Sequence, residues 1–196
     1  MCGVTPVRFT TYDPLWPDRA AVLIAQLGDA LGPDALRIEH IGSTAIPMMD
    51  AKDLLDVQVS VADLDAAAER FDGPLIAMGF ERLPFDRDHV PAGRPDDPAR
   101  WVKRFWRRRS HEAEDVNLHV RLVGSPNGRL ALLFRDWMRA HAEAVPPYAA
   151  FKRTLAAYAP DVDCYSDLKD PVVDLVVAIA ESWARETGWD ATPASA

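Results

Sequence analysis

The sequence predicts an α+β fold, a mixed β-sheet flanked by helices with a helical C-terminal part. Three observations support this prediction. Segments 54–61 and 116–123 have the two-residue alternation of strands. Apolar residues recur at helical spacing both before the first of these segments and after the second. The order helix, strands, helices is typical of an α+β or mixed α/β body.

Composition is that of an ordinary globular protein. The chain has 196 residues, 48% hydrophobic and 27% charged, and is long enough to bury a substantial core. No window approaches the apolar run of a membrane span, and the N-terminus lacks a signal-like pattern. Cys2 and Cys164 are too few for a disulfide framework. We therefore expect a cytoplasmic protein that does not associate with membranes.

The first half of the chain mixes helices and strands. The Tyr12–Pro17 turn starts a helix, which Gly32 and Pro33 end. Asp63 caps a second helix, and Gly73–Pro74 does not fit its interior. The predicted elements are a helix up to residue 31, strands at 35–41 and 54–61, a helix at 63–71, a separate helical turn at 74–78 and a strand at 79–83.

The second half begins with a predicted flexible surface loop at 84–99, rich in proline and aspartate. Strands at 101–108 and 116–123 follow, and then helices at 130–142, 148–158 and 168–187. We expect a core at 1–125, a helical part packed on it at 126–190 and a disordered tail at 191–196.

A Gly-Ser turn followed by a strand acid is the most specific pattern in the chain. Gly42 and Ser43 lie between two predicted strands, and Asp56 stands in the second of them. A turn offering N–H groups and a hydroxyl suits a phosphate, and a strand carboxylate suits its metal ion. Alternatively, Gly42 only permits the turn, Ser43 caps a helical turn and Asp56 faces solvent. Order and spacing together favour the ligand-binding interpretation.

The distribution of charge indicates an anionic ligand. A net charge of −8 argues against a general nucleic-acid binder, which neutralises many phosphates. Basic residues nevertheless gather at 100–109, where alternation places Lys103, Phe105 and Arg107 on one strand face and Trp106 on the other. Such a patch could grip a phosphate or stack a base, or could simply be an exposed strand with solvated charges. The patch favours a nucleotide or another small anion as partner. The sequence does not predict whether the protein forms oligomers.

Motifs along nearly the whole chain carry a family resemblance. They are Tyr12–Trp16, His40–Thr44, Ile46–Pro47, Ala51–Lys52 before Asp56, Asn117–Val120, Phe134–Asp136, Tyr148 with Lys152, and Tyr165 with Lys169. This series resembles the GrpB family of the nucleotidyltransferase superfamily, which is typified by DNA polymerase β. The resemblance implies a nucleotidyltransferase-like sheet.

The resemblance also implies a magnesium site. In the superfamily, a strand after the Gly-Ser turn carries two carboxylates one residue apart, and a later strand supplies a third. Here Asp56 takes the first position, Gln58 the second, and the third falls near Asn117 or His119. A neutral amide offers an oxygen but no charge for a hard cation. Asp115 lies on the same alternating face as Asn117 and His119. We therefore expect Mg²⁺ at Asp56, within an incomplete acidic cluster.

Two functions follow from these residues. The first is transfer of a nucleotidyl or phosphoryl group to a small acceptor in the Gly-Ser/Asp cleft. The alternative is a transfer-inactive protein of the same fold that binds a nucleotide or another anionic metabolite, an interpretation that Gln58 favours. Unrelated acid–base or hydrolytic chemistry using His119 and Asp56 has the least support, because no nucleophile with a positioned base can be identified.

The expected catalytic residues are Asp56 and His119. Several other candidates have structural alternatives: Lys52 could pair with a neighbouring aspartate, Arg135 with Asp136, and histidines are often structural. The expected substrate-binding residues are His40, Gly42, Ser43, Thr44, Lys52, Gln58, Lys103, Arg107, Asn117, Arg135, Tyr148, Lys152, Tyr165 and Lys169.

Overall fold

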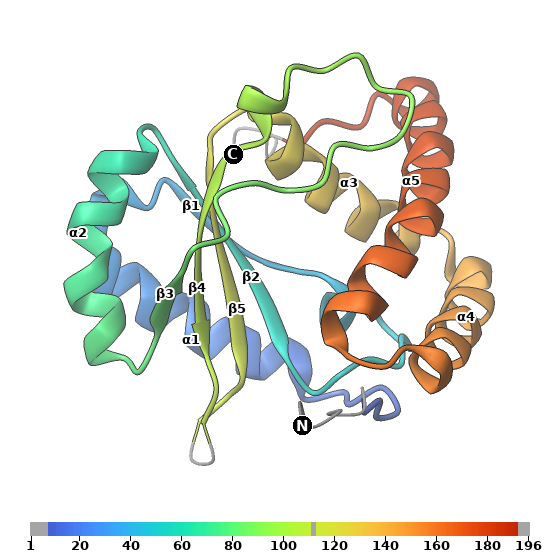
Figure 1. Cartoon of the computed structure of the whole chain (residues 1–196), viewed down its shortest axis with the longest axis horizontal. Helices are drawn as coiled ribbons and strands as arrows, with labels where there is room; N and C mark the ends of the chain where they lie inside the picture. Colours follow the sequence, from blue (N-terminus) through green and yellow to red (C-terminus); the bar gives the residue numbers. More distant parts are fainter. Residues whose placement is uncertain (1–7, 111–112, 192–196) are drawn as a thin grey trace.

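Five strands form one mixed sheet in the computed structural model of the chain, which describes residues 8–110 and 113–191 (Figure 1). The spatial order is β1-β2-β5-β4-β3, with β2 and β5 parallel and the other neighbours antiparallel. Cys2 and residues 192–196 of the predicted tail lie outside the described residues. The strands are β1 (Arg37–Ile41), β2 (Leu55–Val61), β3 (Glu81–Leu83), β4 (Lys103–Arg108) and β5 (Val116–Leu122).

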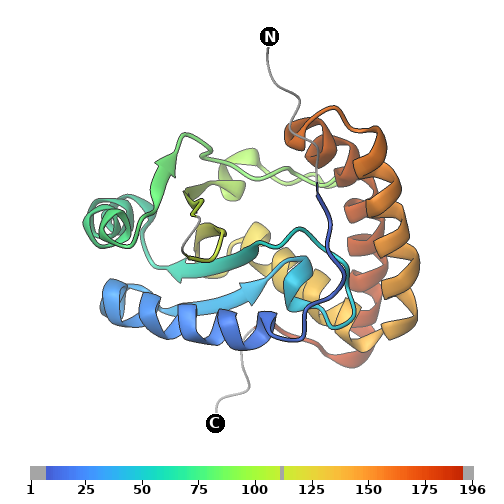
Figure 2. The same ribbon diagram turned by 90° about the horizontal axis from the view of Figure 1, so that it is seen from below.

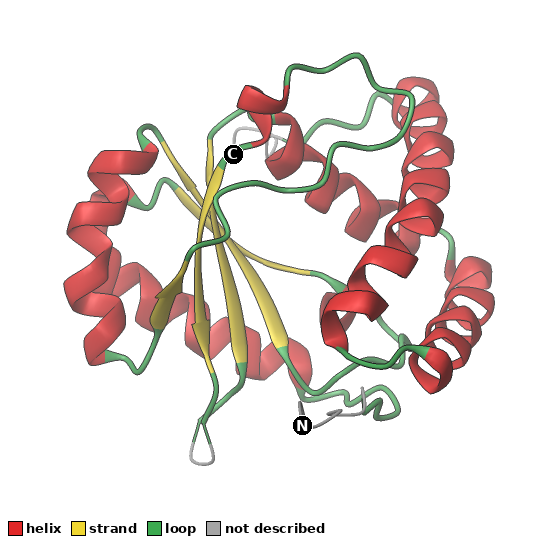
Figure 3. Ribbon diagram, in the orientation of Figure 1, coloured by secondary structure: helices red, strands yellow, loops and turns green. Residues whose placement is uncertain are grey.

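Helices lie on both sides of this sheet (Figure 3). α1 and α2 lie on one side, and α3, α4 and α5 lie on the other (Figure 1). α4 and α5 run side by side (Figure 2). None of the helices in the described part is long and apolar enough to cross a membrane. The helices are α1 (Trp16–Leu31), α2 (Leu64–Ala77), α3 (Pro126–Ala140), α4 (Val145–Tyr158) and α5 (Val162–Thr187).

Strand alternation gives the sheet one apolar and one polar face. Val57 on β2, Leu118 on β5 and Trp106 on β4 are fully buried in one cluster with residues of α1 and α2. Successive strand side chains point to opposite faces, so the intervening residues face α3 to α5. In that register Asp56 pairs with Asn117. The polar face therefore brings together residues from both central strands, and a second apolar cluster holds α3, α4 and α5 together.

The predicted α+β class is confirmed, but the predicted break between a helix at 63–71 and a separate turn at 74–78 is wrong. Helix α2 runs unbroken to Ala77 with Pro74 in its interior, so no separate turn begins there. Pro74 removes one helical hydrogen bond. Phe71 and Leu75, on either side of it, are 1% and 0% exposed in the apolar cluster. Burying two large side chains stabilises the continuous helix by more than one lost hydrogen bond costs.

All three C-terminal helices begin earlier than predicted: α4 begins at Val145 rather than at 148, and the caps of α3 and α5 lie in segments that look like loops. Ser125 accepts from the Gly128 N–H, so α3 begins at Pro126 rather than at residue 130. Asp161 accepts from the Cys164 N–H, so α5 begins at Val162 rather than at 168. The earlier start places Tyr165 on a helix, where its ring is 3% exposed.

Candidate functional site

The Gly-Ser turn packs directly against the strand acid. Gly42 has φ +70°, and a Cβ at this position would lie 2.4 Å from Oδ2 of Asp56. Only glycine allows both the positive φ and this approach. Behind the turn, the Thr44 hydroxyl contacts His40 Nε2 at 2.8 Å and donates to the Leu54 carbonyl at 3.2 Å. The turn is thereby fastened to the start of β2.

Asp56 is held as a carboxylate at the edge of the cleft. Its Oδ1 accepts from Asn117 Nδ2 at 2.9 Å and lies 3.8 Å from His119 Nε2. Burial raises the pKa of Asp56, but His119, Asn117 and Lys52 outweigh it and lower this pKa to about 2. A carboxylate with so low a pKa accepts hydrogen bonds at neutral pH but is a weak general base.

His119 points its ring N–H toward the Asp56 carboxylate and does not act as a base beside it. An arginine can only donate, and Arg121 lies 3.3 Å from His119 Nδ1, so this nitrogen accepts. Burial and the charges of Arg121 and Lys103 lower the pKa of His119 to about 4, so the ring is neutral at pH 7. Its one proton then sits on Nε2, facing Asp56. In this arrangement neither nitrogen is free to take a proton from a substrate.

Ser43 is bonded to a buried lysine on α4. Lys152 donates to the Ser43 hydroxyl at 2.8 Å and to the Asp50 carbonyl at 2.9 Å. It is 2% exposed, and its ammonium lies over the Tyr148 ring at 5.4 Å from the centroid. Burial and the charge of Lys169 lower the pKa of Lys152 to about 7. The turn therefore adjoins a buried amine whose charge changes near neutral pH.

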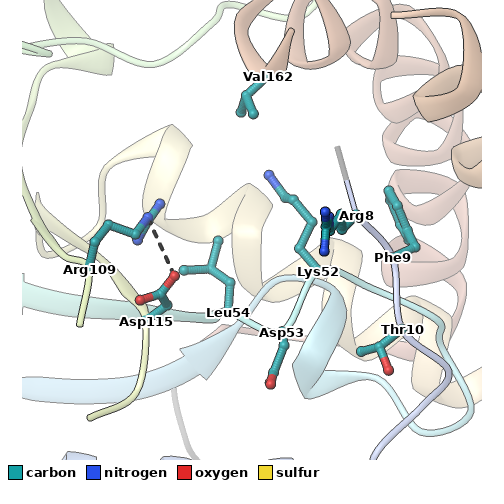
Figure 4. A pocket seen from close by; sticks show the side chains of 9 residues that line it. All are labelled: Arg8, Phe9, Thr10, Lys52, Asp53, Leu54, Arg109, Asp115 and Val162. Carbon is teal, nitrogen blue, oxygen red and sulfur yellow. Dashed lines mark ion pairs between the residues drawn. The ribbon is translucent and has the colours of Figure 1, made fainter. Parts of the chain in front are cut away.

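Leu54, whose carbonyl also accepts from the Thr44 hydroxyl, lies just before β2 and borders a cavity of about 360 Å³ (Figure 4). Lys52 extends into it, and Arg109 lies at its side, 3.7 Å from Asp115. The cavity is lined by Arg8, Phe9, Thr10, Lys52, Asp53, Leu54, Arg109, Asp115 and Val162.

Positive charge at this cavity is only partly compensated. Burial lowers the pKa of Lys52, Asp56 raises it, and the charges of Lys169 and Arg109 lower it again. Within the described part of the chain, neither Lys52 nor Lys169 has a carboxylate in salt-bridge contact. Mutually repelling cations beside a hydroxyl-bearing turn form a site suited to an anion.

The opposite end of the polar face is closed by paired charges. Asp88 accepts from Lys103 at 2.6 Å, from Arg121 at 2.8 Å and from Asn127 at 2.9 Å. These charges hold the pKa of Asp88 far below its usual range despite burial, which raises it. Gln58 is 2% exposed, and its Oε1 accepts from Arg121 at 2.6 Å. Of the predicted substrate contacts, Gln58 and Lys103 therefore lie in a buried network rather than at the cavity.

The donor set does not fit the expected magnesium ion. Oδ1 of Asp56 is bonded to Asn117, Oε1 of Gln58 to Arg121, and the Asn117 Oδ1 accepts from Arg109 at 3.1 Å. Asp115 forms its ion pair with Arg109 and does not complete an acidic cluster. Nowhere in residues 8–110 and 113–191 do three His, Cys, Asp or Glu side chains group to hold a metal. Mg²⁺ is usually held by one or two carboxylates together with water and phosphate, and here the positions beside Asp56 carry neutral amides whose oxygens already accept from arginines.

The remaining predicted residues lie around the cleft wall or away from it. Tyr165 lies under the Lys52 ammonium at 5.6 Å, and Tyr148 lies in the second apolar cluster. Arg107 pairs with Glu81 at the sheet edge. Arg135 donates to the His40 carbonyl at 3.0 Å and to Asp136 at 2.6 Å, so it braces the turn from behind. Sequence reasoning placed these four near the site but did not separate contact from support.

Three important residues escaped prediction. Arg121 continues the alternation of Asn117 and His119 along β5, so periodicity could have identified it. Asp88 and Asn127 lie in a loop and at a helix start, where no periodicity indicates a partner. The loop 84–99, predicted to be a surface loop, thus inserts one carboxylate among buried cations.

Comparison with known proteins agrees with this fold. The family described as "GrpB protein" matches residues 6–178. The crystal structure of conserved protein GrpB from Enterococcus faecalis is similar with a TM-score of 0.72 and 23% identity, covering 90% of this chain and 99% of that chain. This likeness confirms the fold.

Two curated relatives are more similar in sequence. UPF0157 protein BH1888 of Halalkalibacterium halodurans is 32% identical, covering 90% of this chain and 83% of its own length. A Mycolicibacterium paratuberculosis protein named dephospho-CoA kinase is 37% identical, covering 94% of this chain and 48% of its own length. The chain therefore spans about half the length of the mycobacterial relative.

Proposed function

Because the chain belongs to the GrpB family, and with the site geometry as support, we propose that it binds a small phosphate-bearing molecule, a nucleotide or another anionic metabolite. One observation carries the proposal: Lys52 extends into the cavity without a carboxylate in salt-bridge contact among the described residues, and its charge, with that of Lys169, acts on the Lys152 ammonium that donates to Ser43. An anion placed there relieves their repulsion and gains charge-assisted hydrogen bonds.

The turn supplies neutral partners for the same anion. The Ser43–Ala45 segment is a short 3₁₀ turn, and Ser43 already shares a hydrogen bond with the Lys152 ammonium. Backbone N–H groups at the start of such a turn bind phosphate oxygens well. The phosphate would therefore contact Ser43 on one side and Lys52 on the other, with the rest of the molecule in the adjoining cavity.

Group transfer is the second candidate, favoured by the contact between Gly42 and Asp56. In this reaction an acceptor hydroxyl oxygen bonds to phosphorus, and the leaving group departs with the electrons of the broken P–O bond. The hydroxyl proton passes to solvent, and Asp56 accepts a hydrogen bond from the hydroxyl and thereby orients it. The kinase name of the mycobacterial relatives is compatible with such chemistry, but this chain spans only about half of those proteins.

A binding screen followed by a turnover assay tests both candidates. Isothermal titration calorimetry with inorganic pyrophosphate, nucleoside phosphates and sugar phosphates should give saturable binding for at least one of them. Absence of binding throughout the panel would refute the proposed function. For transfer, release of labelled phosphate or pyrophosphate should require an acceptor and disappear in Asp56→Asn. Turnover that survives this substitution would rule out Asp56 as the group that orients the acceptor hydroxyl.

A further inference from the structure

We infer that the cleft binds its phosphate ligand without a divalent metal ion, and that the cavity-lining cations Lys52 and Arg109 supply the positive charge instead. The inference rests on the proposed function and specifies its ligand class: a phosphate-bearing molecule in its free, unchelated form. It follows from where the oxygens and the cations of the polar sheet face are placed.

The first step concerns the oxygens. A metal shared between protein and phosphate needs carboxylate oxygens that are free to coordinate. Asp56 has one, Oδ2, and this atom lies against Gly42, where a Cβ would be 2.4 Å away. Its other oxygen accepts from Asn117 at 2.9 Å. A single oxygen pressed against the turn is a poor anchor for a metal but still accepts a hydrogen bond.

The second step concerns the neighbouring strand position. Gln58 lies on the same face as Asp56, where a second metal-binding carboxylate would be needed, and Arg121 donates to its Oε1 at 2.6 Å. The Arg121 guanidinium also reaches His119 and Asp88. A fixed cation therefore already occupies the space beside this position. A divalent ion next to it would meet like charge in a buried environment.

The third step concerns the charge left for the ligand. Asp88 neutralises the closed end through Lys103 and Arg121. At the open end the cavity is lined by three cations, Arg8, Lys52 and Arg109, and by two carboxylates, Asp53 and Asp115, which pair with Arg19 and Arg109. Cations therefore outnumber the carboxylates that line this cavity. Free phosphate gains more from this arrangement than phosphate already neutralised by magnesium.

Calorimetry of the full chain with inorganic pyrophosphate tests the inference directly. We expect binding in EDTA, and weaker binding when excess Mg²⁺ chelates the pyrophosphate. Binding that becomes about tenfold tighter or more with Mg²⁺ would overturn the inference while leaving the proposed function intact. No binding under either condition would refute the proposed function itself, and the inference with it.

Asp56→Asn provides an independent test, because metal-free binding and metal-dependent binding predict opposite changes in affinity. Without a metal, removing this negative charge strengthens pyrophosphate binding in EDTA by about three- to tenfold, because Asp56 repels the anion. If Asp56 is a metal ligand, the same substitution weakens binding when Mg²⁺ is present, and that result would overturn the inference. Asp34→Asn is the matched control, since Asp34 pairs with Arg70 and should leave the affinity unchanged. The melting temperature of each variant checks its folding.

Discussion

At one end of the polar sheet face, Lys103 and Arg121 share the carboxylate of Asp88 at 2.6 and 2.8 Å. At the other end, Lys52 extends into an open cavity and has no carboxylate in salt-bridge contact among the described residues. The two ends carry similar side chains beside the same sheet. Pairing, rather than residue type, distinguishes them: the paired end stabilises the fold, and the unpaired end retains charge for a ligand.

The largest effect is expected from breaking the paired end. Asp88→Ala leaves two buried cations without their carboxylate and should lower the free energy of unfolding by about 3–5 kcal/mol. Urea denaturation measures this loss. Asp86→Ala, an exposed aspartate in the same loop, is the control and should stay within about 0.5 kcal/mol of the parent. Equal midpoints for the two variants would contradict a structural role for the Asp88 network.

Acid should weaken the fold through two buried histidines. Burial, with nearby arginine and lysine charges, lowers the pKa values of His40 and His119 to about 4. Histidine in the unfolded chain has a pKa of 6.5, so below this pH the unfolded chain binds protons that the folded chain does not bind. Stability is therefore lost as the pH falls from 6.5 to about 4, by a few kcal/mol. Urea midpoints across this range measure the loss, and a flat profile would contradict burial of the neutral rings.

Exchanging lysines between the two ends separates binding from stability. Lys52→Met should weaken pyrophosphate binding about tenfold, about 1.4 kcal/mol, with no loss of folding stability, because it removes a repelled cation. Lys103→Met should do the reverse, lowering stability while leaving affinity within about twofold. Calorimetry and denaturation of both variants provide the measurement. If both variants lose affinity equally, the distinction between the ends is wrong.

The smallest effect concerns pH and the lysine beneath the turn. Lys152, with its pKa lowered to about 7, is charged below that pH and neutral above it. Pyrophosphate affinity should therefore fall a few-fold as the pH rises from about 6 to about 8.5. Lys152→Met should remove this dependence, with Arg70→Met as a control that retains it. An unchanged pH profile in Lys152→Met would assign the dependence to the ligand.

Much of the fold could be predicted from local patterns. Alternation at 54–61 and 116–123 identified both central strands, and it placed Asp56, Asn117 and His119 correctly on the polar side. Helix boundaries failed where the deciding signal was tertiary. Pro74 remains inside α2 because its neighbours are buried against the sheet.

The sequence by itself determined the strand faces, the family resemblance and the Gly-Ser turn, because each depends on short-range spacing or on a motif. Only the tertiary structure decided which charges are paired. Asp88 reaches Arg121 across 33 positions, and Lys152 reaches Ser43 across 109. Such contacts join residues whose spacing carries no periodic signal, so three-dimensional packing alone separates a cation that stabilises the fold from one that awaits a ligand.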